Sequence, residues 1–580
     1  MATFAVDKGF WYTIPERFRD AIQVGSIVRV PLSGRKVRGF VVEIDGDREG
    51  RLKEISALSG ELPVFGPDLV KALHWAATHY VAPLSVLLER AAPPNLPTSG
   101  DPVVVSTGGE PDESHPLQEI ALKVAKGQKR PTTALIGRWQ SLEWLGSVSP
   151  ILGSGASVLV VTGTEAEASS IADAASARGL LPVVVAGEVA RDLTKAWVDA
   201  QQPGRLVVGT PRVGSWQIGG LALAIVLEEG RRAMKDRQTP TIHVRDLMTT
   251  RSRIEGFSLV FYGPTPSVEV LAAGAEVVRH GSRAWPLVEV VDRRDDPPGA
   301  GLLAERTVAA IRAMRDEGRR VFVFTHRRNT DASMRCVGCR RVRTCAGCGS
   351  RIGREQSCRR CGRDAGPCAG CGGTVFEEMG SEPQRLVVEV NRRLGEDLAG
   401  LHPTGRLVTV GTERDLVSLE AVPLAVAVDV DGLMLGHNYR TSEEALRILA
   451  RLANVVEPGH GRRMMAQTSL PDAPLVVALR RGEPVEYLEG LLGERARLGF
   501  PPASEMLAVE IREAADPTGF DRELRELGGA SVLGPAPANP GWRWLIQGSL
   551  GRFKVALRPL AQRWRESGAT VRFDADPIDL

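Results

Sequence analysis

The sequence predicts a multidomain α/β protein that carries a separate metal-binding module. The chain has 580 residues, enough for about three to five domains of ordinary size. Short apolar runs alternate with helical patterns through its central part, which is typical of buried parallel strands. All eight cysteines lie between Cys336 and Cys371. An α/β pattern interrupted by one cysteine cluster predicts a metal-binding insertion.

The composition excludes several classes of protein. Hydrophobic residues make up 43% of the chain, which is ordinary for a globular protein. No apolar run reaches the ~20 residues that a membrane-spanning helix needs. Residues 1–8 lack the basic-then-apolar pattern of a signal peptide. The cysteines are confined to one module, which leaves none for disulfides, so we expect a cytoplasmic protein.

The first hundred residues predict two small domains. Residues 1–50 contain Val/Ile-rich runs at 26–31, 33–38 and 39–44 that are broken by Gly-Arg turns, which indicates a small β-barrel. Residues 64–90 change to the period of a helix. A linker rich in Pro and Gly follows at 92–111.

Two α/β lobes follow the linker. The first contains apolar runs at 157–162, 181–185, 205–209 and 221–226. The same pattern returns at 320–324, stops for the cysteines, and resumes at 406–410 and 424–429. The cysteine module is therefore expected to be inserted into the second lobe. Residues from about 474 predict a final α+β domain.

The cysteines form four Cys-x-x-Cys pairs, which begin at Cys336, Cys345, Cys358 and Cys368. Two residues between cysteines let both thiolates bind one metal ion from a single turn, and tetrahedral zinc needs two such turns. Four pairs supply two complete zinc sites with no ligand left over. Scattered redox or structural cysteines would not share one short window at this spacing. Four pairs permit three pairings, among which the spacing does not choose.

The cysteine module is strongly basic. Between Cys336 and Cys371 there are only two acidic residues, against eight arginines: Arg340, Arg341, Arg343, Arg351, Arg354, Arg359, Arg360 and Arg363. This excess of positive charge favours a phosphate-rich nucleic acid or an acidic protein surface as partner. The alternative is a solvated rim that keeps a small module soluble.

Several short motifs occur in an order that resembles one known family. At the N-terminal end they lie at 12–15, 24–25, 28–31, 35, 39, 52–55 and 75–80. In the second lobe they lie at 429–433, 440, 443 and 467–468, and near the end of the chain at 497–502, 534–537 and 574–577. Together they cover nearly the whole chain and resemble the PriA family (primosomal protein N′) of replication restart proteins.

The resemblance implies an architecture and a zinc arrangement. It implies a DNA 3′-end-binding β-barrel over 1–50, a winged helix over 51–100, RecA-like helicase lobes over 115–285 and over 286–335 with 377–472, a double-zinc module over 336–376 and a C-terminal domain over 474–580. It also implies a nested pairing of the cysteines. One zinc ion would be held by Cys336, Cys339, Cys368 and Cys371, and the other by Cys345, Cys348, Cys358 and Cys361.

The motifs of a helicase motor are degenerate in this chain. A motor needs a Gly-rich loop with Lys and Ser/Thr to hold phosphates and Mg²⁺, but no Gly-Lys-Ser/Thr occurs anywhere. The stretch after 133–136 reads Gly-Arg-Trp-Gln-Ser-Leu-Glu, and the family's Asp-Glu-Glu-His appears as Leu227-Glu-Glu-Gly230. The arginine-rich motif is reduced to the stretch at 450–456. We therefore predict no catalytic residues and regard ATP as a doubtful cofactor, because the electrostatic stabilisation of phosphoryl transfer is lost. Nucleotide binding without hydrolysis stays open.

Candidate DNA contacts lie in the N-terminal domain. The family's 3′-end pocket carries Phe-Asp-Tyr, whereas this chain has Phe10, Trp11 and Tyr12. Trp11 cannot accept a hydrogen bond from a 3′-hydroxyl, but it can stack on a base; the alternative for all three rings is plain barrel packing. Arg29, Arg35, Lys36, Arg38 and Lys53 are the basic candidates. His243 and Arg245, in the first lobe, indicate a scaffold or DNA-backbone role.

These observations lead to a leading hypothesis and two alternatives. The leading hypothesis is a restart protein without helicase activity that binds stalled DNA forks and promotes primosome assembly and helicase reloading. The resemblance implies forked DNA, the replicative helicase, its loader and single-stranded-DNA-binding protein as partners, in the nucleoid. The alternatives are an ATP-dependent 3′→5′ DNA helicase and a zinc-ribbon scaffold that binds only proteins.

Overall fold

The computed structural model describes residues 8–46, 52–98, 115–281, 283–297, 300–326, 334–349, 352–358, 361–378, 383–395, 397–436, 438–513, 516–538 and 540–579. Most of the predicted linker lies outside these residues, as do Arg351, Arg359 and Arg360. The chain divides into two compact units. One unit contains Met1–Leu135, Trp139–Val278 and Glu494–Ile578, and the other contains Arg279–Gly493 with two short segments, Ile136–Arg138 and Asp579–Leu580.

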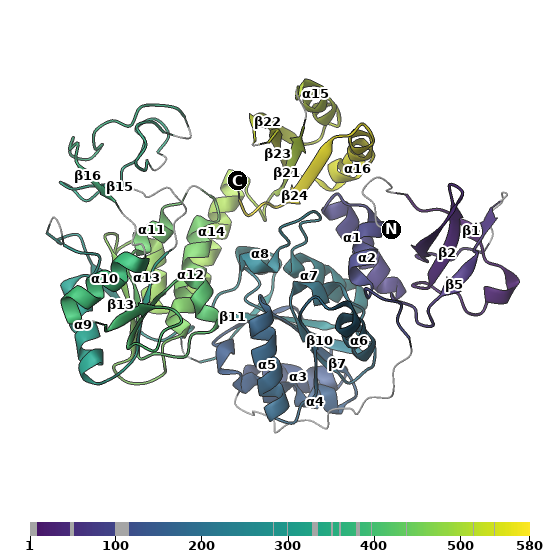
Figure 1. Ribbon diagram of the computed structural model, residues 1–580, viewed down its shortest axis with the longest axis horizontal. Helices are drawn as coiled ribbons and strands as arrows, with labels where there is room; N and C mark the ends of the chain where they lie inside the picture. The colour runs from purple at the N-terminus through teal and green to yellow at the C-terminus, as the bar shows by residue number, and fades with distance from the viewer. Residues whose placement is uncertain are drawn as a thin grey trace. The chain divides into compact units, whose positions relative to one another are not determined.

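The N-terminal domain is built from short strands around a small core (Figure 1). The strands are β1 (Tyr12–Thr13), β2 (Ile27–Leu32), β3 (Arg35–Phe40), β4 (Lys53–Glu54) and β5 (Ala57–Ser59), with a 3-10 turn η1 (Glu16–Phe18). An antiparallel sheet has the order β3-β2-β5, and β1 pairs with β4 in parallel. Ile22, Val28, Val30 and Ile55 form the core. The domain extends past the expected limit at residue 50, because β5 pairs with β2.

Two helices follow, α1 (Pro67–His79) and α2 (Leu84–Ala91). Proline at the first position of α1 suits a helix start because its missing N–H would have no partner there. Leu69, Leu73, Leu87 and Leu88 are buried and join the core of the first lobe. Within the described part of 51–100, the region expected as a winged helix contains these two helices together with the strands β4 and β5.

The first lobe is a seven-stranded sheet with helices on both faces (Figure 1). Its strands are β6 (Thr133–Ile136), β7 (Ser157–Val161), β8 (Pro182–Val185), β9 (Leu206–Gly209), β10 (Leu221–Leu227), β11 (Ser258–Gly263) and β12 (Glu276–Arg279). Their order is β12-β6-β11-β10-β7-β9-β8. The pairs from β11 to β8 are parallel.

The side chains of the central strands alternate between two cores. The helices are α3 (Pro116–Ala125), α4 (Ser149–Gly153), α5 (Glu165–Ala177), α6 (Ala190–Ala200), α7 (Val244–Glu255) and α8 (Val268–Ala272), with 3-10 turns η2 (Trp139–Ser141), η3 (Glu143–Val148), η4 (Pro211–Ser215) and η5 (Arg232–Met234). Val158 and Val160 pack with α3, α4 and α5. Leu159 and Val161 pack with α6 and α7. This alternation is the period of two that a strand imposes.

The second lobe is a six-stranded parallel sheet. Its strands are β13 (Val288–Asp292), β14 (Val321–Phe324), β17 (Ala399–Leu401), β18 (Val408–Gly411), β19 (Leu424–Ala427) and β20 (Arg463–Thr468). Their order is β13-β20-β19-β14-β18-β17, and every neighbouring pair is parallel. The helices are α9 (Glu305–Asp316), α10 (Pro383–Leu394), α11 (Val430–Met434), α12 (Thr441–Asn454) and α13 (Pro474–Arg481), with a 3-10 turn η6 (Glu413–Val417).

Helix α13 belongs to this lobe. The indole Nε1 of Trp285 donates to the carbonyl of Leu479 at 2.8 Å, and Leu475, Val476 and Leu479 are buried. The expected start of the C-terminal domain at residue 474 is therefore too early. The cysteine module lies between β14 and α10, as expected for an insertion, and β15 (Met334–Cys336) and β16 (Phe376–Glu378) pair at its base.

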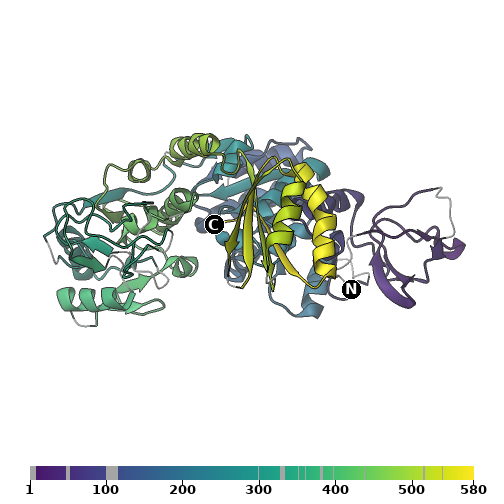
Figure 2. The same cartoon turned by 90° about the horizontal axis from the view of Figure 1, so that it is seen from above.

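The C-terminal domain is an antiparallel sheet with two helices. Helix α14 (Pro484–Leu498) precedes β21 (Glu505–Arg512), α15 (Thr518–Glu526), β22 (Ser531–Pro537), β23 (Trp542–Gly548), α16 (Gly551–Glu566) and β24 (Thr570–Ala575). The strand order is β22-β23-β21-β24. Figure 2 shows α16 alongside the sheet, where Leu557, Leu560 and Trp564 pack on Val509 and Phe573.

The predicted fold class is confirmed: the chain is a multidomain α/β protein with two sheet-and-helix lobes and an inserted module that holds two groups of four cysteines. In the part of the chain that the structure describes, no helix combines the length and the apolar character that a membrane span requires.

A buried lysine of the first lobe holds the C-terminal domain. Lys235 follows η5, and its ammonium lies 2.7 Å from the carboxylate of Asp574. It also donates to the carbonyls of Ala575 and Asp576, at 2.6 and 2.9 Å. A lysine that is only 5% exposed needs such acceptors, because an unpaired buried charge is strongly unfavourable.

The same stretch of chain also holds the two N-terminal helices. Asp236 pairs with Arg90 of α2 at 2.5 Å. Asp246 accepts from the hydroxyl of Tyr80 on α1 at 3.3 Å. The segment from Lys235 to Asp246 therefore joins the first lobe to both of its neighbouring domains within one compact unit.

Replacing Lys235 by methionine should loosen the edge of the C-terminal sheet. Asp574 and two carbonyls would lose their donor, at a cost of about 2 kcal/mol, or about thirtyfold faster hydrogen exchange along β24. Lys71→Met is the control, because Lys71 forms only an exposed pair with Asp68 and should change little. Wild-type exchange rates at 570–575 in the Lys235 variant would contradict this account.

Candidate functional site

The eight cysteine sulfurs gather into two groups of four. The ligand atoms within each group all lie within 4.8 Å of one another. One group contains Cys336, Cys339, Cys368 and Cys371, and the other contains Cys345, Cys348, Cys358 and Cys361. This is the nested grouping that the family resemblance implies. The inner pairs, Cys345–Cys348 and Cys358–Cys361, share one site, and the outer pairs share the other.

The distances between sulfurs fit a metal ion rather than a disulfide. Sulfurs from different turns lie 3.4 to 3.5 Å apart, whereas a disulfide bond is about 2.0 Å long. A tetrahedral ion with Zn–S bonds of about 2.3 Å separates its sulfurs by about 3.8 Å. Each set of four soft thiol donors therefore fits a tetrahedral metal ion.

The backbone of every Cys-x-x-Cys turn has the same shape. The residue after the second cysteine has a positive φ in all four turns: 62° at Arg340, 70° at Gly349, 72° at Gly362 and 72° at Gly372. The N–H of each donates to the carbonyl of the first cysteine at 2.8 to 2.9 Å. Glycine adopts this conformation without strain. Arg340 is the exception, and its guanidinium is held by Glu377 at 2.5 Å.

Backbone N–H groups also point at the sulfurs. Gly347 donates to the sulfur of Cys345 at 3.3 Å, and Gly370 donates to that of Cys368 at 3.4 Å. The N–H of Gly370 is the main influence that lowers the pKa of Cys368 to about 6. Since metals bind the thiolate rather than the thiol, these N–H groups favour the form that binds.

The candidate residues for binding a DNA end lie along β1 and β4. Phe10 is 44% exposed, and the ammonium of Lys8 lies 5.4 Å from the centre of its ring. Tyr12 and Lys53 are directly paired in the parallel ladder. Tyr12 packs against the core of the domain, donates its hydroxyl to the carbonyl of Pro31 at 3.3 Å, and has a pKa raised by burial. Phe10 is therefore the ring that is open to a ligand, and Trp11 is half-buried.

The β2–β3 hairpin presents a row of cations. Arg29 lies directly opposite Arg38, and Lys36 lies opposite Pro31 on the same face. Arg35 is exposed at the turn. Burial and, to a smaller degree, the nearby Arg29 lower the pKa of Arg38. Among the described residues, no carboxylate lies within ion-pair distance of Arg29, Arg35 or Lys36. Like charges that face each other are unfavourable until an anion joins them.

In the first lobe, residues that follow the strands β6, β10 and β11 are bonded to one another. Glu228, just after β10, accepts from the indole of Trp139 at 2.8 Å and from the amide of Gln140 at 3.1 Å. Both donors follow β6. Glu229 accepts from the N–H of Ser267, after β11, at 2.7 Å. Glu228 has a positive φ of 49°, which a non-glycine residue adopts only where its surroundings fix it.

Arg231 completes this cluster. Its guanidinium lies 2.7 Å from the carboxylate of Glu167 and 3.7 Å from that of Glu228. It also lies against Gly163, just after β7, where an added Cβ would be 2.8 Å from Nη1. Glu228, Glu229 and Arg231 are 3%, 1% and 6% exposed. Ligands of α/β proteins usually bind at this edge of the sheet, but here it is occupied by the protein's own bonded side chains.

This cluster was only partly visible in the sequence. The stretches around Trp139 and Glu228 were recognised as altered motifs, but Arg231 and Glu167 were not identified. Arg231 is one of many arginines, and Glu167 lies 64 residues away from it in the chain. Nothing in the sequence around either residue predicts that the two form an ion pair.

Other candidate residues of the lobes are bonded within them. Arg451 of α12, in the reduced arginine-rich motif, lies 3.9 Å from the carboxylate of Glu413, which also pairs with the neighbouring Arg447 at 2.8 Å. His243 and Arg245 are both buried, and the ring of His243 accepts from the N–H of Arg245 at the start of α7. These contacts give the four residues structural roles in the lobes.

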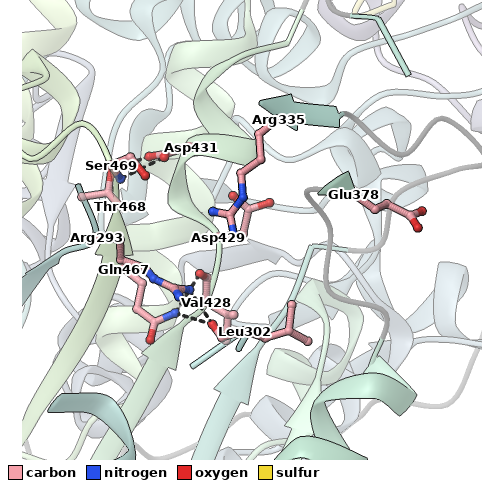
Figure 3. Close-up of a pocket in the computed structure, with 10 residues that line it drawn as sticks. All are labelled: Arg293, Leu302, Arg335, Glu378, Val428, Asp429, Asp431, Gln467, Thr468 and Ser469. Atoms are coloured by element: carbon pink, nitrogen blue, oxygen red, sulfur yellow. Dashed lines mark hydrogen bonds between the residues drawn. The ribbon is translucent and has the colours of Figure 1, made fainter. Parts of the chain in front are cut away.

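A small pocket of about 50 Å³ lies at the carboxyl ends of β19 and β20 (Figure 3). Gln467 donates to the carbonyls of Leu302 and Val428 at 2.9 and 3.0 Å. Asp431 accepts from the hydroxyl of Thr468 and from the N–H of Ser469, and burial raises its pKa. Several family-like residues therefore meet here, in bonds that hold β20 to α11.

Comparison with known proteins gives a consistent result. The 3′ DNA-binding domain of PriA matches residues 2–93 as a sequence family. A Mycobacterium tuberculosis protein named "Probable replication restart protein PriA" is 24% identical over 98% of this chain and 95% of its own length. The Mycobacterium leprae protein of the same name is 25% identical over 99% of both chains. Among solved structures, a DEAD box protein from Methanococcus jannaschii has a TM-score of 0.32 at 11% identity and covers 63% of this chain and 89% of its own.

The matches agree with the family that the short motifs of the sequence indicated. The domain match covers the N-terminal strands and helices, and the curated relatives extend it over nearly the full chain. Over nearly its full length the chain is similar to replication restart proteins of the PriA family, and residues 2–93 match the 3′ DNA-binding domain of PriA.

Proposed function

We propose that this protein binds DNA at stalled or abandoned replication forks and promotes reloading of the replicative helicase, without acting as a helicase itself. The observation that carries this proposal is the bonded cluster of Trp139, Glu167, Glu228 and Arg231 at the edge of the first lobe. The match to a 3′ DNA-binding domain over residues 2–93 supports the DNA-binding half of the proposal.

The cluster opposes nucleotide hydrolysis for a physical reason. Phosphoryl transfer needs a backbone cradle for the phosphates and carboxylates that hold Mg²⁺. Here Glu228 accepts from two side chains, and Glu229 accepts from a backbone N–H. A nucleotide would have to break these bonds and expose a buried ion pair, and breaking such pairs is strongly unfavourable.

We propose that each four-cysteine group holds one zinc ion. A closed set of four thiolates is the ligand set of a structural zinc site, which has no open position for chemistry. The ion would crosslink two turns that are up to 35 residues apart in the chain. The module would thereby gain stability that its few buried residues cannot supply.

The proposed DNA contacts come from two parts of the N-terminal domain. The cations of the β2–β3 hairpin suit a run of phosphates, because a phosphate next to Arg29 and Arg38 would relieve their repulsion. Phe10, Trp11 and Lys53 suit the bases and backbone of a strand end. The proposed protein partners are the replicative helicase, its loader and single-stranded-DNA-binding protein, in the cytoplasm at the nucleoid. This part of the proposal rests on the names of the relatives.

Two other functions remain testable. A helicase would hydrolyse ATP on forked DNA and separate its strands. A scaffold that binds only proteins would show neither a preference for forks over linear duplex nor salt-dependent DNA affinity. The cations of the hairpin, which have no carboxylate partner among the described residues, argue against the scaffold alternative, whereas a helicase would also bind DNA through them.

Removing two hairpin charges should weaken binding to a forked DNA. The double variant Arg35→Gln with Lys36→Gln should bind less tightly, and the slope of log affinity against log salt should become shallower by about 2, because two phosphate contacts are lost. The matched control is Arg319→Gln with Arg320→Gln, a neighbouring pair that is bonded to Glu457 and Glu420. Unchanged fork binding in the hairpin variant would contradict the proposed interface.

Removing one pair of inner cysteines should release one metal ion only. Cys345→Ser with Cys348→Ser breaks the inner group, while all four ligands of the outer group remain. Metal analysis should fall from two zinc ions per chain to one. Loss of both ions would show that the two sites do not form independently.

A further inference from the structure

Both metal sites are built from the same two kinds of Cys-x-x-Cys turn. The repetition is not obvious in the sequence, because one site is nested inside the other. We name the turns Cys336–Cys339 and Cys358–Cys361 the arginine turns, since an arginine follows two residues after each. We name the turns Cys345–Cys348 and Cys368–Cys371 the glycine turns, since both read Cys-Ala-Gly-Cys-Gly. Each site pairs one arginine turn with one glycine turn.

The backbones of the two arginine turns match. In the first, the N–H of Cys336 donates to the carbonyl of Arg341 at 2.8 Å, and Arg335 bridges to Val342. In the second, the N–H of Cys358 donates to the carbonyl of Arg363 at 2.7 Å, and Ser357 bridges to Asp364. Arg341 and Arg363 therefore occupy equivalent positions in the two sites.

Each of these arginines lies on the glycine turn of its own site. A Cβ added to Gly370 would be 2.6 Å from Cδ and 3.0 Å from Nη1 of Arg341. A Cβ added to Gly347 would be 2.9 Å from Cζ and 3.0 Å from Nη1 of Arg363. Only glycine leaves room for this approach. The same two glycines donate their N–H groups to the sulfurs of Cys368 and Cys345.

Neither arginine has an acidic partner in the part of the chain that the structure describes. Both side chains belong to exposed residues, and among the described residues no carboxylate lies within ion-pair distance of either. The neighbouring Arg340, by contrast, pairs with Glu377, and Arg354 pairs with Glu378. The thiolates of the glycine turn on which each arginine lies are a source of negative charge for it.

A tetrathiolate zinc site supplies that charge. Four thiolates and one Zn²⁺ carry a net charge of −2, which electrostatic reasoning about such a site has to include. We propose that Arg341 and Arg363 are positioning residues for the two metal sites, each lying on the N–H···S turn and balancing the negative charge of its own centre. This inference rests on the proposed binding of zinc.

Two zinc–thiolate centres would change the net charge of the module. Eight arginines and two acids give a formal charge of +6 between Cys336 and Cys371. Two centres of −2 each would reduce it to +2. Most of the positive charge that favoured a nucleic-acid partner would then balance the negative charge of the two zinc centres. DNA binding would be left to the N-terminal domain.

The test measures zinc release from the full-length protein into a chromogenic chelator. Arg341→Met and Arg363→Met should each speed the release of one zinc ion about tenfold, as changes next to ligands do, and should leave the other ion at its wild-type rate. Arg341→Lys and Arg363→Lys, which keep the charge, should recover part of the difference. Cobalt substitution, read by its thiolate charge-transfer absorption, shows whether the altered site still forms.

The controls separate this inference from the proposal beneath it. Arg354→Met removes the same charge from the module, but from an arginine that is paired with Glu378, and it should release zinc at the wild-type rate. Wild-type protein without two zinc ions per chain would overturn the proposed metal sites. Two zinc ions in every variant, released at wild-type rates, would overturn the inference alone. Weaker fork binding with unchanged release would assign both arginines to DNA instead.

Discussion

The carboxylate of Glu228 decides what the first lobe can do. It stands at the end of the central strand β10 and accepts from Trp139 and Gln140, which follow β6. Arg231 lies between it and Glu167 and rests on the backbone of Gly163, after β7. The ends of three strands are thereby fixed to one another by charges and hydrogen bonds out of contact with water. Such contacts are strong because water does not compete for them.

Because its strand ends are fixed to one another, the first lobe can support its neighbouring domains. Four residues after Arg231, Lys235 holds the last strand of the C-terminal domain. Asp236 and Asp246 hold the helices α2 and α1. In a motor, the corresponding segment would have to respond to a nucleotide. Here the beginning of the segment, at Arg231, is bonded within the lobe, and the part from Lys235 to Asp246 contacts two neighbouring domains. This arrangement is suited to holding DNA-binding parts in fixed positions.

The sequence was most informative where a single physical signal dominates. The apolar runs at 157–162, 205–209 and 424–429 became β7, β9 and β19 within two residues, because buried parallel strands have no polar face to obscure them. The Cys-x-x-Cys spacing predicted that the cysteines gather in fours, because two ligands of one metal ion can come from a single turn. Strand β5 was missed because three residues are too short for a periodic pattern, and its place depends on pairing with β2. The pairing of Arg231 with Glu167, and the approach of Arg341 to Gly370, join residues that only the folded chain brings together.

The central proposal is that this protein binds forks without a working motor. The most direct test is ATP hydrolysis by the zinc-loaded protein on a forked DNA that it demonstrably binds. The account predicts no hydrolysis above background, with or without the fork. Fork-stimulated hydrolysis that disappears in Glu228→Gln or Glu229→Gln would contradict it, because the cluster at the end of β10 would then hold a nucleotide rather than exclude one.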